Sequence, residues 1–169
     1  MNRKCVAFVL PAALALASCS RTEASGEQRP VAAKLVADKA LLDGSLVSVS
    51  HSEWDAGRTA DLFDGDLATM ARTANADPAI LEIRLPQPRP LSGISLTTGG
   101  MDAGLKVVVR PAGGAAPRTY ARTFRDMPTD PTFGLDFDTG PARIESLRVE
   151  LKDLRGGDGH IHIRSLRLF

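Results

Sequence analysis

Cysteine is almost absent from this sequence. Its 169 residues include two cysteines, Cys5 and Cys19, and both precede residue 20. Residues 20–169 therefore hold no thiol, which excludes a disulfide, a cysteine nucleophile and a cysteine-ligated zinc site from that part of the chain. The stability of a domain there must come from its hydrophobic core, and the chain is long enough for one such domain.

Aromatic residues and net charge are also scarce. Phe, Trp and Tyr make up 5% of the chain, with one Trp and one Tyr, so few side chains are left for stacking on a sugar or a base. The formal net charge is +1, from 21 basic and 20 acidic residues, which gives no overall attraction to nucleic acid. We therefore expect no nucleic-acid partner.

The first 19 residues have the pattern of an export signal. Arg3 and Lys4 precede an apolar run over residues 5–17 that is broken by one proline, and this run is too short to be a comfortable transmembrane helix. A Leu-Ala-Ser-Cys sequence that ends at Cys19 follows, and it resembles the lipobox of bacterial lipoproteins. The alternative is an ordinary signal peptide whose cleavage site contains a cysteine.

The lipobox resemblance implies cleavage before Cys19, a diacylglycerol on its thiol and acylation of the new amino terminus. Several acyl chains attach a protein stably to a membrane, where one chain binds only marginally. We expect a signal peptide over residues 1–18, the lipidated cysteine and a tether over 19–42, and the domain over 43–169. Ser20 is not Asp, which by analogy directs such a lipoprotein to the outer membrane of a bacterial cell envelope.

The segment after the cysteine reads as a spacer. Residues 20–30 are small and polar, a composition that cannot bury much apolar surface and is typical of a flexible tether. Residues 31–42 mix apolar residues such as Leu35 and Leu41 with charged ones. Two interpretations stay open for these residues, a short helix on the domain surface and a continuation of the tether.

From residue 46 onward, apolar and polar residues alternate in short segments separated by Gly and Pro. The clearest apolar sets are Leu81, Ile83 and Leu85; Leu105, Val107 and Val109; Phe133, Leu135 and Phe137; and Leu147, Val149 and Leu151. This period of two predicts an all-β domain, an antiparallel sandwich or barrel with one face of each sheet buried. Arginines such as Arg84, Arg110 and Arg148 fall on the polar faces, which we interpret as solvated sheet surface interleaved with acids. Helix is expected for about one turn, at residues 58–63.

The last strand interrupts its own alternation. Ile161 and Ile163 occupy odd positions, whereas Leu166 and Leu168 occupy even ones, so a regular strand would turn the two pairs to opposite faces. One extra residue near positions 164–165 would return both pairs to the core. The sequence therefore predicts a β-bulge there.

The loop over residues 61–69 gathers oxygen-bearing side chains. They are Asp61, Asp64, Asp66 and Thr69. Asp and Gly tolerate turn conformations, so the loop can be a tight turn. It can also be a Ca²⁺ site, because calcium prefers about six to eight hard oxygen ligands. An EF-hand is excluded, since its spacing would place Ala60, Leu62 and Ala71 at ligand positions.

Four stretches resemble the discoidin family, also called coagulation factor V/VIII C-type domains, within the galactose-binding-like sandwiches. They are the loop over residues 62–69, which is similar to the family's Asp-Gly-Asp-x-x-Thr loop, the strand over 78–85 that follows it, the strand over 142–151 and the terminal strand over 161–169. The likeness covers residues 46–169. It implies an antiparallel jelly-roll β-sandwich of about eight strands.

The resemblance also implies a calcium ion held by the Asp64 side chain, by the backbone oxygens of Asp61 and Asp66, and by Thr69. The implied metal set is Asp61, Asp64, Asp66, Thr69 and, at the predicted bulge, Arg164. Ser165 stands where the family places a Glu ligand, and Ala71 where it places a Trp. Because loss of a charged ligand weakens calcium binding, Ca²⁺ as a cofactor and a metal-free loop of the same shape both stay open.

His51 and Trp54 are the candidate ligand-binding residues. Trp54 lies in a polar segment, where an exposed indole can stack on a sugar ring and a histidine can bond a hydroxyl. The alternative is a Trp that caps the core. His160 and His162 near Asp158 have a spacing that can hold a metal, but a solvent-facing strand edge is the simpler interpretation.

The sequence indicates no catalytic set, because no nucleophile and no orienting residue can be assigned to any of the three histidines. The protein is therefore expected not to be an enzyme. By family analogy, the expected function is that of a membrane-anchored binding lipoprotein that recognises a glycan or another envelope polymer. The alternative is a structural or assembly lipoprotein whose sandwich docks on an envelope protein without a small ligand.

Overall fold

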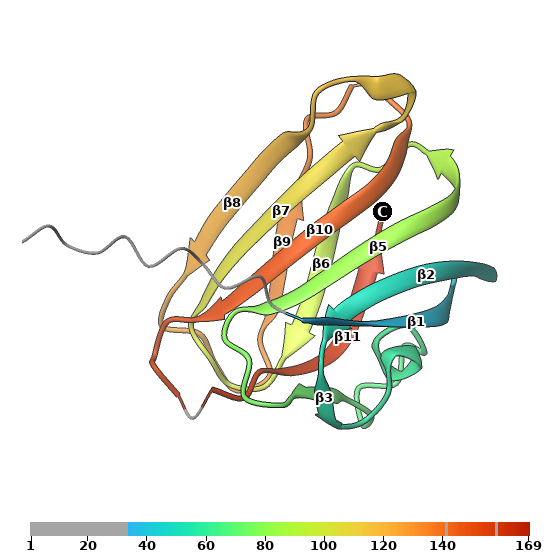
Figure 1. Cartoon of the computed structure of the whole chain (residues 1–169). Coiled ribbons are helices and arrows are strands. Elements are labelled where there is room, and N and C mark those ends of the chain that lie inside the picture. Colours follow the sequence, from blue (N-terminus) through green and yellow to red (C-terminus); the bar gives the residue numbers. More distant parts are fainter. Residues whose placement is uncertain (1–33, 141, 158) are drawn as a thin grey trace, which may run out of the picture. The chain divides into compact units, whose positions relative to one another are not determined.

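The structure is a computed structural model that describes residues 34–140, 142–157 and 159–169. In these residues two antiparallel sheets face each other as a sandwich (Figure 1). Sheet A has the strand order β1 (Leu35–Leu42), β2 (Ser45–Ser52), β5 (Ala79–Arg89), β10 (Ile144–Asp153), β7 (Ala103–Pro111) and β8 (Arg118–Phe124). Sheet B has the order β3 (Trp54–Ala56), β4 (Ala71–Thr73), β11 (His162–Leu168), β6 (Gly93–Thr98) and β9 (Thr132–Asp136). The predicted all-β sandwich is confirmed.

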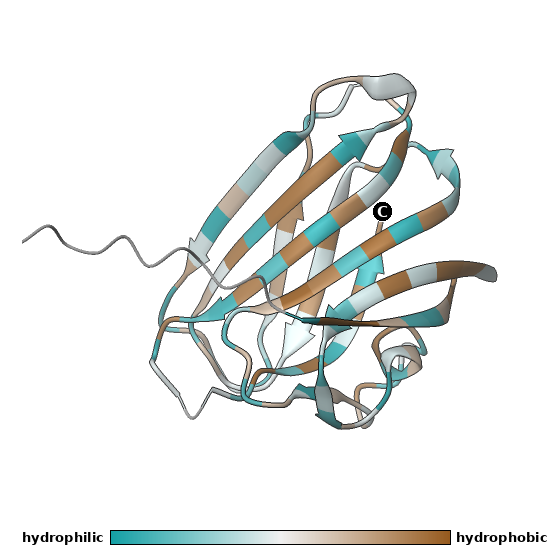
Figure 2. Cartoon of the chain, viewed as in Figure 1, coloured by the Kyte–Doolittle hydropathy of each residue, from teal (hydrophilic) through white to brown (hydrophobic). Residues whose placement is uncertain are grey.

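The core lies between the two sheets and follows from the alternation. Apolar and polar residues alternate along the strands in Figure 2, because successive side chains of a strand point to opposite faces. Leu81 and Ile83 from sheet A and Ile94, Leu96 and Phe133 from sheet B are each less than 2% exposed. Full burial of a side chain of this size contributes about 1.5–3 kcal/mol, so the core can stabilise the domain without disulfides.

The predicted β-bulge is present in β11. The register between β11 and β6 shifts between Ile163 and Ser165, and Ile163 and Leu166 are both buried on either side of the shift. The predicted helical turn is present as a 3-10 turn, η1 (Thr59–Leu62), and a second short turn, η2 (Ala112–Gly114), follows β7. Among the described residues, no helix has both the length and the apolar character needed to cross a membrane.

The structure differs from our expectation over residues 35–42, which form strand β1 instead of helix or tether. Asp43 and Gly44 connect β1 to β2 with φ angles of 50° and 76°, the conformation of a tight two-residue hairpin turn. The sheet therefore begins before residue 43. As the edge strand of sheet A, β1 buries only Ala40 and Leu42, so its apolar pattern is weak.

The proline-rich stretch over residues 86–90 also differs from the expectation that prolines separate the strands. Strand β5 instead continues to Arg89, which pairs with β10. Its pairing with β2 on the other side ends at Arg84. Neither Pro86 nor Pro88 has an N–H to donate to a neighbouring strand, so β2 and β5 diverge at this point.

Candidate functional site

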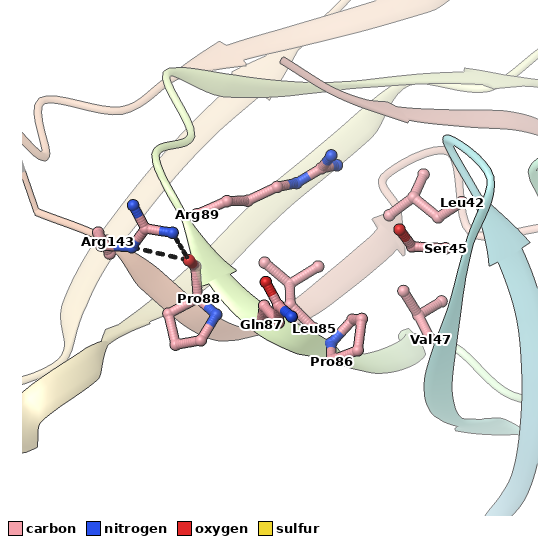
Figure 3. A pocket seen from close by; sticks show the side chains of 9 residues that line it. All are labelled: Leu42, Ser45, Val47, Leu85, Pro86, Gln87, Pro88, Arg89 and Arg143. Carbon is pink, nitrogen blue, oxygen red and sulfur yellow. Dashed lines mark hydrogen bonds between the residues drawn. The ribbon is translucent and has the colours of Figure 1, made fainter.

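The divergence of β2 and β5 opens a pocket in sheet A (Figure 3). Its cavity has a volume of about 320 Å³, at the lower end of the roughly 300–1,000 Å³ typical of small-molecule sites. Leu42, Val47 and Leu85 supply its apolar lining, and all three are buried. The pocket therefore exists because two prolines end a ladder beside core residues.

Arginine side chains supply much of the polar lining. Arg89 extends from β5 across the pocket toward the β1–β2 hairpin (Figure 3), where its Nη2 donates to Asp43 Oδ2 at 2.7 Å. Arg143 Nε donates to the Pro88 carbonyl at 2.8 Å. The Gln87 amide also lines the cavity and can both donate and accept hydrogen bonds.

One buried donor in this pocket has no partner. Arg89 Nε is fully shielded from solvent, and no hydrogen-bond acceptor among the described residues reaches it. Buried polar groups without a partner are rare in native structures and cost about 1–3 kcal/mol. Because the atom has almost no accessible surface, a ligand oxygen could reach it only after the Arg89 side chain moved.

The pocket has the chemistry of a binding site. The nine residues that line it include no carboxylate, histidine or cysteine, so the lining offers no general base that could activate the hydroxyl of Ser45. Apolar surface beside a few hydrogen-bonding groups suits a small polar molecule with one apolar face.

The loop over residues 61–69 folds its oxygens around one hydroxyl. Thr69 Oγ1 lies 2.9 Å from Asp64 Oδ2, 2.8 Å from the Asp66 carbonyl oxygen and 3.5 Å from the Asp61 carbonyl oxygen. A hydroxyl carries a single proton, so it cannot satisfy three acceptors. These four oxygens are hard ligands of the kind that Ca²⁺ takes, and the donor set fits the ion that the resemblance implies.

Other side chains of the expected metal set are engaged elsewhere. The Asp61 carboxylate accepts the Arg58 amide at 2.9 Å and Arg58 Nη2 at 3.1 Å. The Arg164 guanidinium donates to the Leu67 carbonyl at 3.0 Å and to Asp130 Oδ1 at 3.1 Å. Because a guanidinium has only donors, the expectation of Arg164 as a metal-site residue does not hold for its side chain. No cluster of three or more His, Cys, Asp or Glu side chains suited to a metal occurs in the described parts of the chain.

His51 and Trp54 do not form an open platform. Their rings stack at 4.7 Å between centroids, with 10° between the planes, and His51 is 3% exposed. His51 Nδ1 lies 2.7 Å from the Ser52 carbonyl oxygen, while His51 Nε2 and Trp54 Nε1 both contact Thr59 Oγ1, at 2.9 and 3.2 Å. The pair packs against the core, as in the alternative that the sequence left open.

His160 belongs to a polar cluster with residues of β3 and β4. Its Nδ1 lies 2.7 Å from the Thr73 carbonyl oxygen and 3.6 Å from Asp55 Oδ2. Arg72 donates to both oxygens of Asp55, and this hydrogen bonding holds the pKa of the Asp55 carboxyl below its ordinary value. The strand-edge interpretation suits this arrangement.

The predicted signal peptide over residues 1–18, the lipidated Cys19, the tether up to residue 33 and Asp158 lie outside the described residues. The lipid attachment at Cys19 and the metal alternative that included Asp158 therefore stay predictions. His162, the remaining member of that alternative, lies on β11.

Solved structures resemble this chain over the whole sandwich. A family 32 carbohydrate-binding module of NanJ from Clostridium perfringens, solved with galactose, matches with a TM-score of 0.56 at 20% identity, over 72% of this chain and 92% of that one. An F5/8 type C domain from Bacteroides fragilis matches with a TM-score of 0.54 at 22% identity, over 72% of this chain and 89% of that one. The fold is that of the discoidin domains.

The same fold occurs in other settings. A chain of the complex between reduced XRCC1 and the catalytic domain of DNA polymerase β matches with a TM-score of 0.55 at 13% identity, over 71% of this chain and 92% of that one. No family model and no curated protein matches this sequence. The likeness therefore rests on the discoidin-type sandwich, and ligands must be argued from the residues.

Proposed function

We propose that this chain is a non-catalytic, glycan-binding domain that uses the pocket between β2 and β5. The observation that carries the proposal is a pocket in which the Gln87 amide and the Arg89 guanidinium lie beside apolar side chains. A sugar hydroxyl can bond the Gln87 amide or an outer guanidinium nitrogen, and Leu42 and Leu85 offer apolar contact to the C–H groups of a sugar ring. Support for a carbohydrate as the ligand class comes from similar modules solved with galactose and with GlcNAc-α-1,4-galactose.

A membrane anchor and a structural ion belong to the same proposal. Lipid on Cys19 would attach the protein to the envelope of a bacterium, at the outer membrane, and the polar residues 20–30 would act as the spacer. Ca²⁺ would bind the loop over residues 61–69 through Asp64, Thr69 and backbone oxygens. The ion would stabilise the loop without taking part in glycan recognition.

A glycan panel read by thermal melts of the full chain tests the pocket. A glycan at a hundred times its Kd should add about 2.7 kcal/mol to the free energy of unfolding. The variants Gln87→Ala and Arg89→Met should lose this gain, whereas Arg167→Met, which removes an exposed arginine from β11, should keep it. An equal gain in all three variants, or no gain with any glycan, would contradict the proposal.

A second candidate function is docking on an envelope protein, and one observation favours it. Leu41 and Leu46 face each other across the β1–β2 pair and are 62% and 54% exposed. They adjoin β1, which is the edge strand of sheet A among the described residues, and unpaired backbone groups of an edge strand can accept another strand. If Leu41→Ser abolishes capture of one stoichiometric envelope protein and the glycan panel is negative, this function replaces the first.

A further inference from the structure

The outer face of sheet A, which is turned away from the core, concentrates positive charge. Its strands carry six basic and three acidic side chains. They are Lys39, Arg84, Lys106, Arg110, Arg148 and Lys152, with Glu82, Glu150 and, at the bulge of β10, Glu145. The face is therefore +3, and since the whole chain is +1, the rest of the chain is 1 − 3 = −2.

Ion pairs neutralise one part of this face. Arg148 pairs with Glu82 on the neighbouring strand and with Glu150 at 3.0 Å, and Lys106 pairs with Glu150 at 3.1 Å. The hydrogen bond to Glu150 raises the pKa of Arg148, and the hydrogen bond from Arg148 lowers the pKa of Glu150. Two of the three acids of the face, Glu82 and Glu150, are engaged in this cluster.

The paired residues of the next row include no acid, and the exposed Glu145 lies beside this row at the bulge of β10. Across β1, β2, β5, β10 and β7 it places Lys39, Ser48, Arg84, Ser146 and Arg110 beside one another. The three cationic side chains are exposed, and none has an ion-pair or hydrogen-bond partner among the described residues. Neighbouring strands lie about 4.8 Å apart, so the cations stand about 10 Å apart with one serine between each pair. Aligned like charges repel one another, and bound anions would relieve that repulsion.

A hollow of about 350 Å³ follows this row. Polar groups from four strands dominate its lining: Ser48, Ser50, Glu82, Arg84, Arg110, Ser146 and Arg148. No aromatic side chain lines it, so it offers no platform on which nucleic-acid bases could stack. A membrane is too flat to enter this hollow and would contact only its rim. A single extended polymer chain can lie inside it.

We propose that this row binds an acidic polysaccharide whose chain runs across the strands of sheet A. Carboxylate or sulfate groups would pair with Arg84, Arg110 and Lys39, because the planar guanidinium binds such groups through two parallel hydrogen bonds. The serine hydroxyls would bond sugar hydroxyls. The hollow shares no lining residue with the pocket between β2 and β5, so this site stands independently of the function proposed for that pocket.

Binding of the full chain to polygalacturonate, dextran sulfate and neutral dextran tests the proposal. The double variant Arg84→Gln/Arg110→Gln removes both arginines of the row. The control Arg125→Gln/Arg167→Gln removes the same charge from exposed positions off this face. We expect the first variant to bind the acidic polymers at least about tenfold more weakly and the control to change by less than about twofold, because hydrogen bonds between charged groups are among the strongest. The melting temperature of the first variant should not fall, since both arginines lack partners in the described residues.

Salt and membranes supply the remaining controls. Binding should weaken between about 0.1 M and 1 M salt, where the Debye length falls from about 10 Å to 3 Å. The proposal is overturned if the parent protein binds neither acidic polymer, if it binds neutral dextran equally well, or if both double variants lose binding equally. It is also overturned if the protein binds phosphatidylglycerol vesicles in place of the polysaccharides and the row variant loses only that binding.

Discussion

Calcium should raise the melting temperature of this protein, but only at millimolar concentration. The Asp64 carboxylate is the one full negative charge turned toward Thr69. The Asp61 carboxylate is held by Arg58, and Asp66 Oδ1 accepts the Ala68 amide at 2.8 Å. Sites with few charged ligands bind calcium weakly, with Kd values of about 10⁻⁴ to 10⁻³ M.

The size of the effect follows from that affinity. At about 10 mM Ca²⁺, a site with this Kd range adds about 1.4–2.7 kcal/mol to the free energy of unfolding, provided the unfolded chain does not bind the ion. For a domain of this size, 1 kcal/mol corresponds to roughly 4 °C in Tm. The expected gain is therefore about 5–10 °C.

Circular-dichroism melts of the full chain with Ca²⁺, with Mg²⁺ and with EDTA measure this gain. Mg²⁺ should give a much smaller shift, because it requires near-octahedral geometry and gives up its water reluctantly. Asp64→Asn keeps the shape of the side chain but removes its charge, so the variant should lose most of the calcium-dependent gain. A parent protein that melts identically with calcium and EDTA, or an undiminished gain in Asp64→Asn, would refute the reasoning.

Three other substitutions probe the backbone, a charge pair and the anchor. Gly57 has a φ of 74°, and an added Cβ would lie 1.8 Å from the Met70 carbonyl oxygen, so Gly57→Ala should lower the free energy of unfolding by about 3 kcal/mol in urea titrations. The hydrogen bond from Arg148 holds the pKa of Glu150 below its ordinary value of 4.5. Ionised Glu150 therefore stabilises the fold above about pH 4.5, and this contribution is lost as the pH falls through the lower pKa of the folded state. Urea titrations of Glu150→Gln should show a deficit of about 0.5 kcal/mol at neutral pH that disappears in acid. Cys19→Ser should move the protein from the membrane fraction to the soluble fraction and abolish incorporation of labelled palmitate.

Much of the sandwich could be predicted because strand periodicity is local. Residues such as Leu81 and Ile83 alternate with charged neighbours wherever one face of a strand meets the core, and the change of parity over residues 161–168 located the bulge. Strand β1 was not predicted, because it buries only two side chains and its apolar alternation is weak. The Asp43-Gly44 dipeptide after it is a strong signal of a two-residue hairpin turn, and reading it would have recovered this strand.

The pocket could not be predicted because it depends on which strand lies beside β5. Pro86 and Pro88 mark an interruption in a ladder, but they open a cavity only because β2 is the neighbour that separates there. The contact that spans the pocket joins Arg89 to Asp43, 46 residues earlier in the chain. In contrast, the loop over residues 61–69 could be identified as a candidate site from the sequence, because its oxygen-bearing side chains lie within a single short stretch of the chain.

The charge of the outer face shows why register matters for function. Read along a strand, Glu82 beside Arg84 and Arg148 beside Glu150 give the impression of a balanced surface, which is how we interpreted these arginines from the sequence. Across the strands, the pairing aligns Arg84 with Ser146 and Arg110 and places Glu82 and Glu150 in the two rows that follow. A slip of one residue between β5 and β10 would turn these side chains toward the other face. The unbalanced row is therefore a property of the long-range pairing, and it lies in the direction that a polymer crossing the sheet would follow.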